Sequence, residues 1–315
     1  MYDVLIIGLG AAGYTAAVYS ARYKLSTFIV GAEEGGMGMT AAEVGNWPGD
    51  IDVRGPDLME RFKNHALSFG DLVTHKIAWV KSIEKIDGGF RLHLESGDTV
   101  DGKTIIFAMG SSKRHLGAPG EEEFSGKGVT YCATCDAFFY RNKTVAVIGG
   151  GDSAVEGAAI VAQVAKQVYL IHRRSDFRAE PYWVDRVQSR DNVTFVLERN
   201  VAEIVGNERV TGVKLDKPFE GQETLAVDGV FIEIGSLPST ELGKSLGCAL
   251  DSKGFLQVDG AMATTVPGVF GAGDVTSGSN HFAQFATAAG EGAVAANSVF
   301  NYLQSGGKHE GGHMA

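Results

Sequence analysis

The sequence predicts an α/β fold with two Rossmann-like nucleotide-binding units. The main observation is that a glycine-rich turn between a buried strand and a helix occurs at Val4–Gly13 and again at Thr144–Ala154. Composition agrees, since 43 glycines, only 7 prolines and 44% hydrophobic residues are typical of a compact α/β protein with many tight turns. At 315 residues the chain is long enough for two domains, each with its own core.

The first unit begins at the N-terminus. Asp3–Ile7 is almost continuously apolar, as expected for a strand buried on both faces. Gly8–Gly13 turns the chain, Tyr14–Tyr23 predicts a helix, and Thr27–Val30 predicts the next parallel strand. These elements complete a βαβ unit.

The rest of the first unit shows both periodicities. A helix is expected to start at Pro56 and to end near Gly70, with Leu58, Phe62, Ala66 and Phe69 on one face. Lys76–Asp101 contains short strand-like stretches, and Thr104–Phe107 predicts another buried strand.

The pattern then restarts. Thr144–Ile148 predicts a strand, Ser153–Ala165 a helix and Gln167–Ile171 the following strand. Ser153 and Glu156 have the spacing of a capping box. Later elements are expected as strands at Val230–Ile234 and Gly268–Phe270 and as a long helix from about Phe282 to Leu303.

Two glycine-containing stretches, Gly110–Gly120 and Gly235–Gly243, are expected to be the crossings between domains. The tail Ser305–Ala315 is glycine-rich and is interpreted as a disordered terminus, so its His309 and His313 are not taken as metal ligands.

Charge and cysteine usage exclude several classes. Lys and Arg number 28 against 38 Asp and Glu, a formal net charge of −10, which argues against a nucleic-acid-binding protein. No apolar run reaches membrane-spanning length, and the first strand begins too early for a signal peptide. Three cysteines form no structural disulfide framework, so a cytoplasmic protein is expected, with Cys248 as a small buried hydrophobe.

Cys132 and Cys135 have C-x-x-C spacing and lie just before the second glycine turn. Two such thiols can close a small disulfide, which beside two dinucleotide motifs suggests electrons passing from one cofactor through another to the disulfide. The alternatives are chance or zinc, but zinc requires four ligands and no second pair has usable spacing. Asp136, directly after the pair, is either a proton-transferring carboxylate or a helix cap.

The first turn satisfies G-x-G-x-x-G with Gly8, Gly10 and Gly13. Glycines there permit a tight turn, close approach of a pyrophosphate and close helix packing. No acid stands at the end of the next strand for a ribose hydroxyl, and Glu33 and Glu34 come slightly later.

The second turn reads Gly149-Gly-Gly151-Asp-Ser-Ala154, with alanine at the third fingerprint position. After its next strand stand His172, Arg173 and Arg174, with Arg178 one helical turn beyond. Guanidinium groups bind a 2′-phosphate that an acid would repel, so NADP(H) is preferred over a solvated basic turn.

Over nearly its whole length the chain resembles the bacterial-type, low-molecular-weight thioredoxin reductases. The matching stretches are Gly8–Ala17, Glu43–Gly49, Cys132–Asn142, Gly149–Glu156, Ile171–Ala179 and Pro267–Asp274. The resemblance is not expected to extend to the high-molecular-weight relatives, which carry their disulfide near the N-terminus and a C-terminal dimer domain.

The resemblance implies two Rossmann-like, three-layer ββα domains of the pyridine nucleotide-disulfide oxidoreductase type, the second inserted in the first. Residues 1–113 and 242–315 would bind FAD, and residues 114–241 would bind NADPH and carry the redox disulfide Cys132–Cys135. The implied FAD residues are Gly8, Gly10, Ala11, Ala12, Gly13, Gly35, Gly36, Met37, Asn46, Ala108, Gly110, Gly273, Asp274, Gln284 and Phe285. The NADPH residues are Gly149, Gly151, Asp152, Ser153, Ala154, His172, Arg173, Arg174, Arg178 and Gly235.

The resemblance also implies a homodimer that passes electrons from NADPH through FAD and the disulfide to thioredoxin. Cys135 is expected to face the flavin, and Cys132 the partner. Because the disulfide and the NADPH site both lie on residues 116–239 yet must reach one flavin ring, a domain rotation about the two crossings is expected.

Three positions depart from the family pattern. Met37 replaces the glutamine of Gly-Gly-Gln, Met109 replaces the threonine of Ala-Thr-Gly, and Ala283 replaces the arginine of Arg-Gln. Each change removes a polar or charged group from near a cofactor.

Two other functions remain open. The same dithiol flavoenzyme could take electrons from ferredoxin or a deazaflavin, or deliver them to another small dithiol protein. A flavin-binding sensor without turnover would share the fold, although the intact C-x-x-C-D sequence argues against it.

Overall fold

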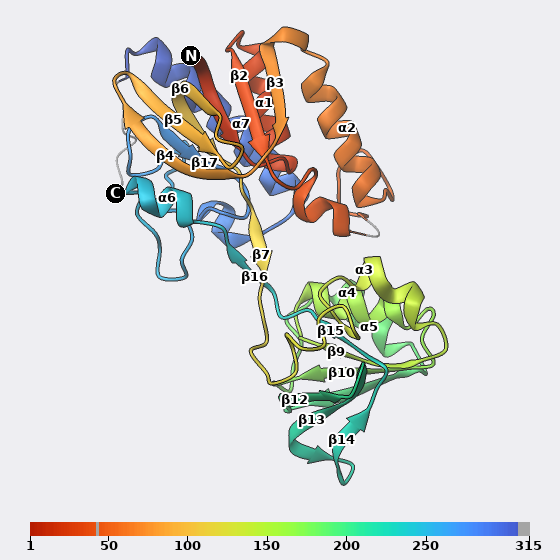
Figure 1. Ribbon diagram of the computed structural model, residues 1–315. Helices are drawn as coiled ribbons and strands as arrows, with labels where there is room; N and C mark the ends of the chain where they lie inside the picture. Colours follow the sequence, from red (N-terminus) through yellow and green to blue (C-terminus); the bar gives the residue numbers. More distant parts are fainter. Residues whose placement is uncertain (42–43, 308–315) are drawn as a thin grey trace. The chain divides into compact units, whose positions relative to one another are not determined.

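The computed structural model describes residues 1–41 and 44–307, so Glu43 of the matched stretch and the tail histidines His309 and His313 lie outside the described residues. The chain forms two compact units, Met1–Ser112 with Pro238–Ala315, and Lys113–Leu237. Figure 1 colours both units by sequence. Each unit is a mixed α/β fold, as the sequence predicts.

The first unit contains strands β1 (Tyr2–Ile7), β2 (Thr27–Gly31), β3 (Val73–Ile77), β4 (Val80–Ile86), β5 (Gly89–Leu94), β6 (Thr99–Phe107) and β17 (Val269–Gly271). Its helices are α1 (Ala11–Arg22), α2 (Gly55–Leu67), α6 (Glu241–Leu246) and α7 (Phe285–Gln304), with 3₁₀ turns η1 (Gly36–Thr40), η2 (Gly70–Leu72) and η4 (Gly278–His281). The sheet order is β3-β2-β1-β6-β5-β4, and β17 also pairs with β6. The segment β3-β2-β1-β6 is parallel, whereas β4, β5 and β6 are antiparallel.

The alternation of side chains along β1 builds three layers. Val4 and Ile6 point toward a core shared with α1 and α7, because successive strand residues face opposite sides of a sheet. Leu5 and Ile7 point the other way and pack with Leu92 and other residues of the antiparallel arm. The parallel strands are therefore buried on both faces, which explains their continuous apolar sequence.

The second unit contains strands β8 (Val129–Thr130), β9 (Thr144–Ile148), β10 (Gln167–His172), β11 (Val193–Leu197), β12 (Val201–Gly206), β13 (Val210–Phe219), β14 (Gln222–Ala226) and β15 (Gly229–Ile232). Its helices are α3 (Ala133–Asp136), α4 (Asp152–Val161) and α5 (Pro181–Gln188), with η3 (Ala137–Tyr140) as a 3₁₀ turn. A parallel sheet has the order β11-β10-β9-β15-β8, and β12-β13-β14 form an antiparallel sheet.

The same three layers recur here. Val145 and Val147 of β9 pack with α4, whereas Ala146 and Ile148 pack with the β12–β14 sheet. In Figure 1 the helices α3, α4 and α5 and the sheet β12–β14 cover opposite faces of the parallel sheet. Both units are thus ββα sandwiches, which confirms the predicted fold class.

The two crossings between units pair with each other. β7 (Ser111–Lys113) and β16 (Ser236–Pro238) form a two-stranded sheet. Gly110 and Gly235, at the ends of these strands, have φ of 62° and 92°, a left-handed conformation that favours glycine.

Two local predictions are wrong. Gly151, rather than Ser153, is the N-cap of α4, and no side chain caps that helix, so the predicted capping box is absent. Helix α2 ends at Leu67 rather than at Gly70, because Gly70 starts a separate 3₁₀ turn.

Candidate functional site

Close packing around the first glycine turn requires glycine at two of its positions. A Cβ on Gly8 would lie 2.0 Å from the carbonyl oxygen of Ala108, and one on Gly13 would lie 2.0 Å from the carbonyl oxygen of Gly8. The turn therefore fits only without side chains at these positions, and it places the start of α1 against the end of β6.

The space in front of this turn fits a phosphate. A Cβ on Gly10 would meet no atom within 4 Å, and one on Gly36 would come no closer than 3.9 Å to Gly10. Helix α1 has no side-chain cap and no acid in its first turn, so the amides of Ala11 and Ala12 face this open space under the positive end of the helix dipole. The donor set suits the pyrophosphate of FAD.

Two acids, Glu33 and Glu34, stand shortly after β2. Glu34 is engaged, because Lys63 donates to its carboxylate at 2.7 Å and His75 lies 3.7 Å from it. Glu33 is exposed. Glu33 is therefore the better candidate for a ribose hydroxyl.

Asp274, half-buried just after β17, lies close to the buried Glu291 of α7. Glu291 on α7 accepts from the amide of Gly273 at 2.8 Å and from the hydroxyl of Thr276 at 3.1 Å. Burial, together with the charge of Glu291, raises the pKa of Asp274 to about 6. Sequence reasoning found Asp274 but missed Glu291, which follows after η4 and the first turns of α7.

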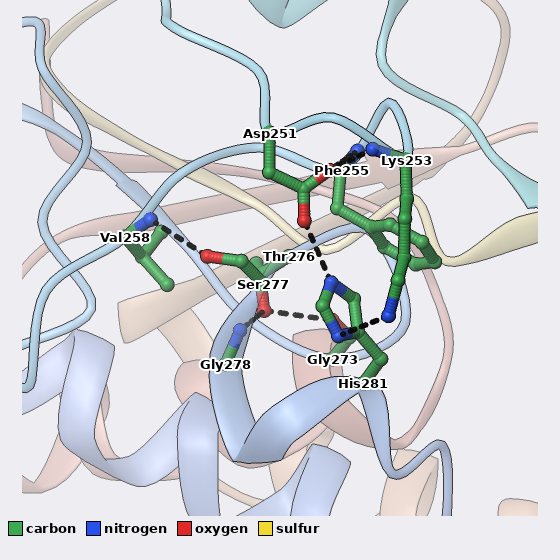
Figure 2. A network of polar contacts seen from close by, with 9 residues as sticks. All are labelled: Asp251, Lys253, Phe255, Val258, Gly273, Thr276, Ser277, Gly278 and His281. Atoms are coloured by element: carbon green, nitrogen blue, oxygen red, sulfur yellow. Dashed lines mark hydrogen bonds and ion pairs between the residues drawn. The ribbon is translucent and has the colours of Figure 1, made fainter.

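Figure 2 shows how the surrounding loops are braced. Thr276 accepts from the amide of Gly278 at 3.1 Å, and the hydroxyl of Ser277 accepts from the amide of Val258 at 3.2 Å. His281 bonds Asp251 at 2.7 Å. These contacts hold the segment that leads into α7.

Two predicted FAD residues meet at the start of α7. Asn46 donates to the side chain of Gln284 at 2.9 Å, and Gln284 forms a capping box with Thr287. Met37, in η1, is 37% exposed. Phe285 instead packs with the core that includes Met59, so its ring contributes to packing.

The second glycine turn has the same construction. A Cβ on Gly149 would lie 2.2 Å from the carbonyl oxygen of Glu233, whereas one on Gly151 would meet no atom within 4 Å. Ser153 is exposed and Ala154 is buried at the uncapped start of α4. The carboxylate of Asp152 accepts from the amide of Glu180 at 2.7 Å, which fixes the loop before α5.

His172 is buried, unlike the exposed arginines that follow it. It stacks on Phe177 at 5.7 Å, and a Cβ on Gly150 would lie 2.3 Å from its ring. Burial, together with the nearby arginines, lowers its pKa, so a neutral ring is favoured. We therefore assign His172 to support of the glycine turn, a role that its place in the sequence does not reveal.

The three arginines are free to bind a ligand. Arg173, Arg174 and Arg178 are exposed, and within the described part of the chain no hydrogen bond or ion pair engages their side chains. The amide of Arg178 donates to Gly150 at 2.8 Å, which ties this segment to the glycine turn. The segment from Arg173 to Arg178 forms bends and loop rather than a helix.

Cys132 and Cys135 are joined in a disulfide. Cys132 is the N-cap of the short helix α3 and is half-buried, and Cys135 lies on that helix and is exposed. The amide of Cys135 donates to the sulfur of Cys132 at 3.2 Å. Asp136 accepts a hydrogen bond from Thr130 and makes no helix-capping bond, which favours proton transfer over capping as its role.

Two exposed aromatic residues follow the disulfide. Phe138 and Phe139 are each 69% exposed on η3, and Arg141 lies over the ring of Phe138 at 5.3 Å. Sequence reasoning missed them, although two adjacent phenylalanines directly after the C-x-x-C turn were the signal.

The free cysteine Cys248 is buried and bonds Thr264, as predicted for a small core residue. Among residues 1–41 and 44–307, no cluster of potential metal ligands is present and no helix is long and apolar enough to span a membrane.

Comparison with known proteins places this geometry in context. A family model described as pyridine nucleotide-disulphide oxidoreductase matches residues 2–292. Thioredoxin reductase of Mycolicibacterium smegmatis is 40% identical, covering 96% of this chain and 97% of that protein. A crystal structure of Lactococcus lactis thioredoxin reductase in its FR conformation has a TM-score of 0.91 and 35% identity, covering 97% of this chain and all of that one. A glucosaminate ammonia-lyase of Pseudomonas fluorescens is 43% identical, covering 95% of each chain.

Proposed function

The chain belongs to the pyridine nucleotide-disulphide oxidoreductase family, and from that premise we propose that it is an NADPH-dependent thioredoxin reductase. The observation that carries the proposal is the Cys132–Cys135 disulfide at the surface of a unit that also holds an uncapped glycine turn. A bound flavin would take the hydride of NADPH and supply two electrons to this disulfide.

We assign FAD to the first unit and NADPH to the second. The open glycine turn before α1, Asp274 and the Asn46–Gln284 contact support the FAD site. The open turn before α4 and the unengaged arginines support the NADPH site, with Arg173, Arg174 and Arg178 on the 2′-phosphate. The remaining residues of the predicted FAD and NADPH sets keep their assignments, except that Phe285 and His172 act through packing.

Residues of the second unit have separate roles in the proposed reduction of the partner. Reduction breaks the Cys132–Cys135 bond, and one thiolate then attacks the disulfide of the partner. Asp136, which Thr130 holds next to the disulfide turn, is the candidate carboxyl for proton transfer to the leaving sulfur. The exposed rings of Phe138 and Phe139 offer an apolar surface beside this bond, suited to a small partner protein such as thioredoxin.

A homodimer and a cytoplasmic location complete the proposal. They rest on the family resemblance alone, and an ultracentrifuge measurement and a fractionation of the source cells test them.

Anaerobic stopped-flow mixing tests the enzyme assignment. NADPH is expected to reduce the bound flavin much faster than NADH, and added thioredoxin to reoxidise it. If only ferredoxin or a deazaflavin reduces the flavin, the electron donor is not NADPH. If only another dithiol protein reoxidises it, the acceptor is not thioredoxin. No flavin reduction by any donor, with ammonia released from glucosaminate, would overturn the assignment in favour of the activity named for the Pseudomonas relative.

A further inference from the structure

A buried carboxylate stands directly behind the disulfide turn. Glu233, just after β15, is only 5% exposed, and its Oε1 accepts from the amide of Ala133, next to Cys132, at 3.2 Å. Its Oε2 accepts from the ammonium of Lys113 at 2.8 Å. One side chain thus joins segments that lie 100 and 120 residues away in the sequence.

The backbone of Glu233 is fixed as firmly as its side chain. Its amide donates to Ile148 at 2.9 Å, and its carbonyl oxygen packs against Gly149 of the nucleotide turn. A Cβ on Gly157 of α4 would lie 3.0 Å from that of Ala133 and 3.6 Å from Cγ of Glu233. The disulfide turn is therefore packed on α4 and Glu233 with little room to shift.

A buried charge is tolerated when it is paired and hydrogen-bonded. Burial raises the pKa of Glu233, whereas Lys113 and the amide of Ala133 oppose that shift. Lys113 is the last residue of β7, where the chain crosses into the second unit, and its side chain is 23% exposed. Neither residue belongs to the predicted catalytic or cofactor set.

We propose that Glu233 and Lys113 are positioning residues for the redox disulfide: Glu233 fixes the Cys132 end of the turn, and Lys113 compensates the charge of Glu233 so that the reduced dithiol is not disfavoured. The proposal rests on the proposed function in taking Cys132–Cys135 as the redox pair. Reduction by NADPH breaks the S–S bond, adds two electrons and takes up two protons, or one when one sulfur stays a thiolate. A negative charge beside the turn opposes that thiolate, and a positive charge favours it.

The two single variants are therefore expected to act in opposite directions. Lys113→Gln leaves the carboxylate uncompensated and makes the disulfide harder to reduce. Glu233→Gln leaves the ammonium uncompensated and makes it easier to reduce. The double variant removes both charges and returns close to the wild type. Asp136, the other acid at the turn, is unchanged in all of them.

The experiment equilibrates the full flavin-loaded chain with dithiothreitol redox buffers and counts the Cys132 and Cys135 thiols by alkylation and mass spectrometry. Each single variant is expected to change the equilibrium constant by about three- to tenfold, roughly 15–30 mV for a two-electron couple, and the double variant by less than about twofold. Lys166→Gln, at an exposed lysine of the same unit, is the matched control and should change nothing. Lys113→Arg should also resemble the wild type, since it keeps the charge.

Shifts of both single variants in the same direction, or a double variant that does not revert, would overturn the proposal, because a purely structural role moves all three alike. If Glu233→Gln does not fold, the comparison of Lys113→Gln with Lys113→Arg decides, and equal potentials would overturn it. The measurement needs no NADPH or thioredoxin. If the wild type fails to reduce thioredoxin, the proposed function is refuted, but the measured disulfide equilibria of the variants still stand.

Discussion

Two acids that are partly or fully removed from solvent, Asp274 and Glu233, have raised pKa values. Asp274 is half-buried near Glu291, and its pKa is raised from 3.8 to about 6. Glu233 is deeper but is compensated by Lys113. A carboxyl that is costly to ionise without its ligand is well suited to a hydroxyl or phosphate-linked group of a cofactor, which matches the role proposed for Asp274.

Asp274 makes the stability of the apoprotein pH-dependent. The pKa of Asp274 is higher in the folded state than in the unfolded state, so the folded state binds the proton more tightly. The contribution of Asp274 to the free energy of unfolding therefore falls as pH rises from about 4 to about 6. Asp274→Asn removes that loss. Chemical denaturation of apoprotein should show the variant gaining about 2–3 kcal/mol relative to wild type between about pH 4 and pH 7.

Asp71→Asn, at an exposed position of the same unit, serves as the control and should show no such gain. An equal stability difference for Asp274→Asn at both pH values would contradict the buried, ionised carboxyl.

The arginines after β10 are proposed to determine the choice of NADPH over NADH. A charge-assisted bond contributes about 1.5–3 kcal/mol, so Arg174→Ala should raise the KM for NADPH roughly tenfold or more and leave that for NADH almost unchanged. Steady-state kinetics with both cofactors measure this. Arg209→Ala, an exposed arginine elsewhere in the unit, is the control. Equal use of NADPH and NADH by the wild type would refute the assignment.

Both units position these residues with the same arrangement of strand, glycine turn and helix. In both units a parallel strand ends in glycines that pack against a neighbouring strand end, and a helix without a side-chain cap follows. The result is a set of free amides at the carboxyl edge of the sheet, where nucleotides bind. The second unit adds α3 and η3, which present the disulfide and two aromatic rings.

The aromatic turn η3 has a testable role. Replacing both Phe138 and Phe139 by alanine removes apolar surface that a partner would bury, and burial of one phenylalanine contributes about 1.5–3 kcal/mol. The KM for thioredoxin should rise roughly tenfold or more, while reduction of the flavin by NADPH stays unchanged. Trp79→Ala, an exposed aromatic of the first unit, should leave both unchanged. A normal KM in the double variant would place the docking surface elsewhere.

Elements with a continuous pattern were predictable. β9 was expected at Thr144–Ile148 and has those bounds, because an unbroken apolar run between a turn and glycines predicts a buried strand. The N-cap of α4 was not predictable from the sequence. Ser153 matches a capping box locally, but the glycine turn places Gly151 at the N-cap. The burial of His172 and the Glu233–Lys113 pair depend on contacts between distant segments, which sequence spacing does not encode.

At the scale of the whole molecule, the disulfide and the proposed NADPH site belong to one unit, and under the proposed function each must exchange electrons with a flavin bound to the other unit. We therefore expect the second unit to rotate about the crossings β7 and β16, where Gly110 and Gly235 can absorb backbone changes. A short bifunctional cross-link between the units should abolish thioredoxin reduction and spare at most one half-reaction. Full turnover of the cross-linked protein would contradict the rotation.

The most direct test counts the electrons that the chain accepts. In an anaerobic titration with NADPH, the wild type should take up about two equivalents per chain, one for the flavin and one for the disulfide, each a two-electron couple. The Cys132→Ser/Cys135→Ser variant should take up about one equivalent, at an unchanged rate of flavin reduction, and should not reduce thioredoxin. A wild type that accepts only one equivalent, or a double variant that still reduces thioredoxin, would show that electrons do not pass through Cys132 and Cys135.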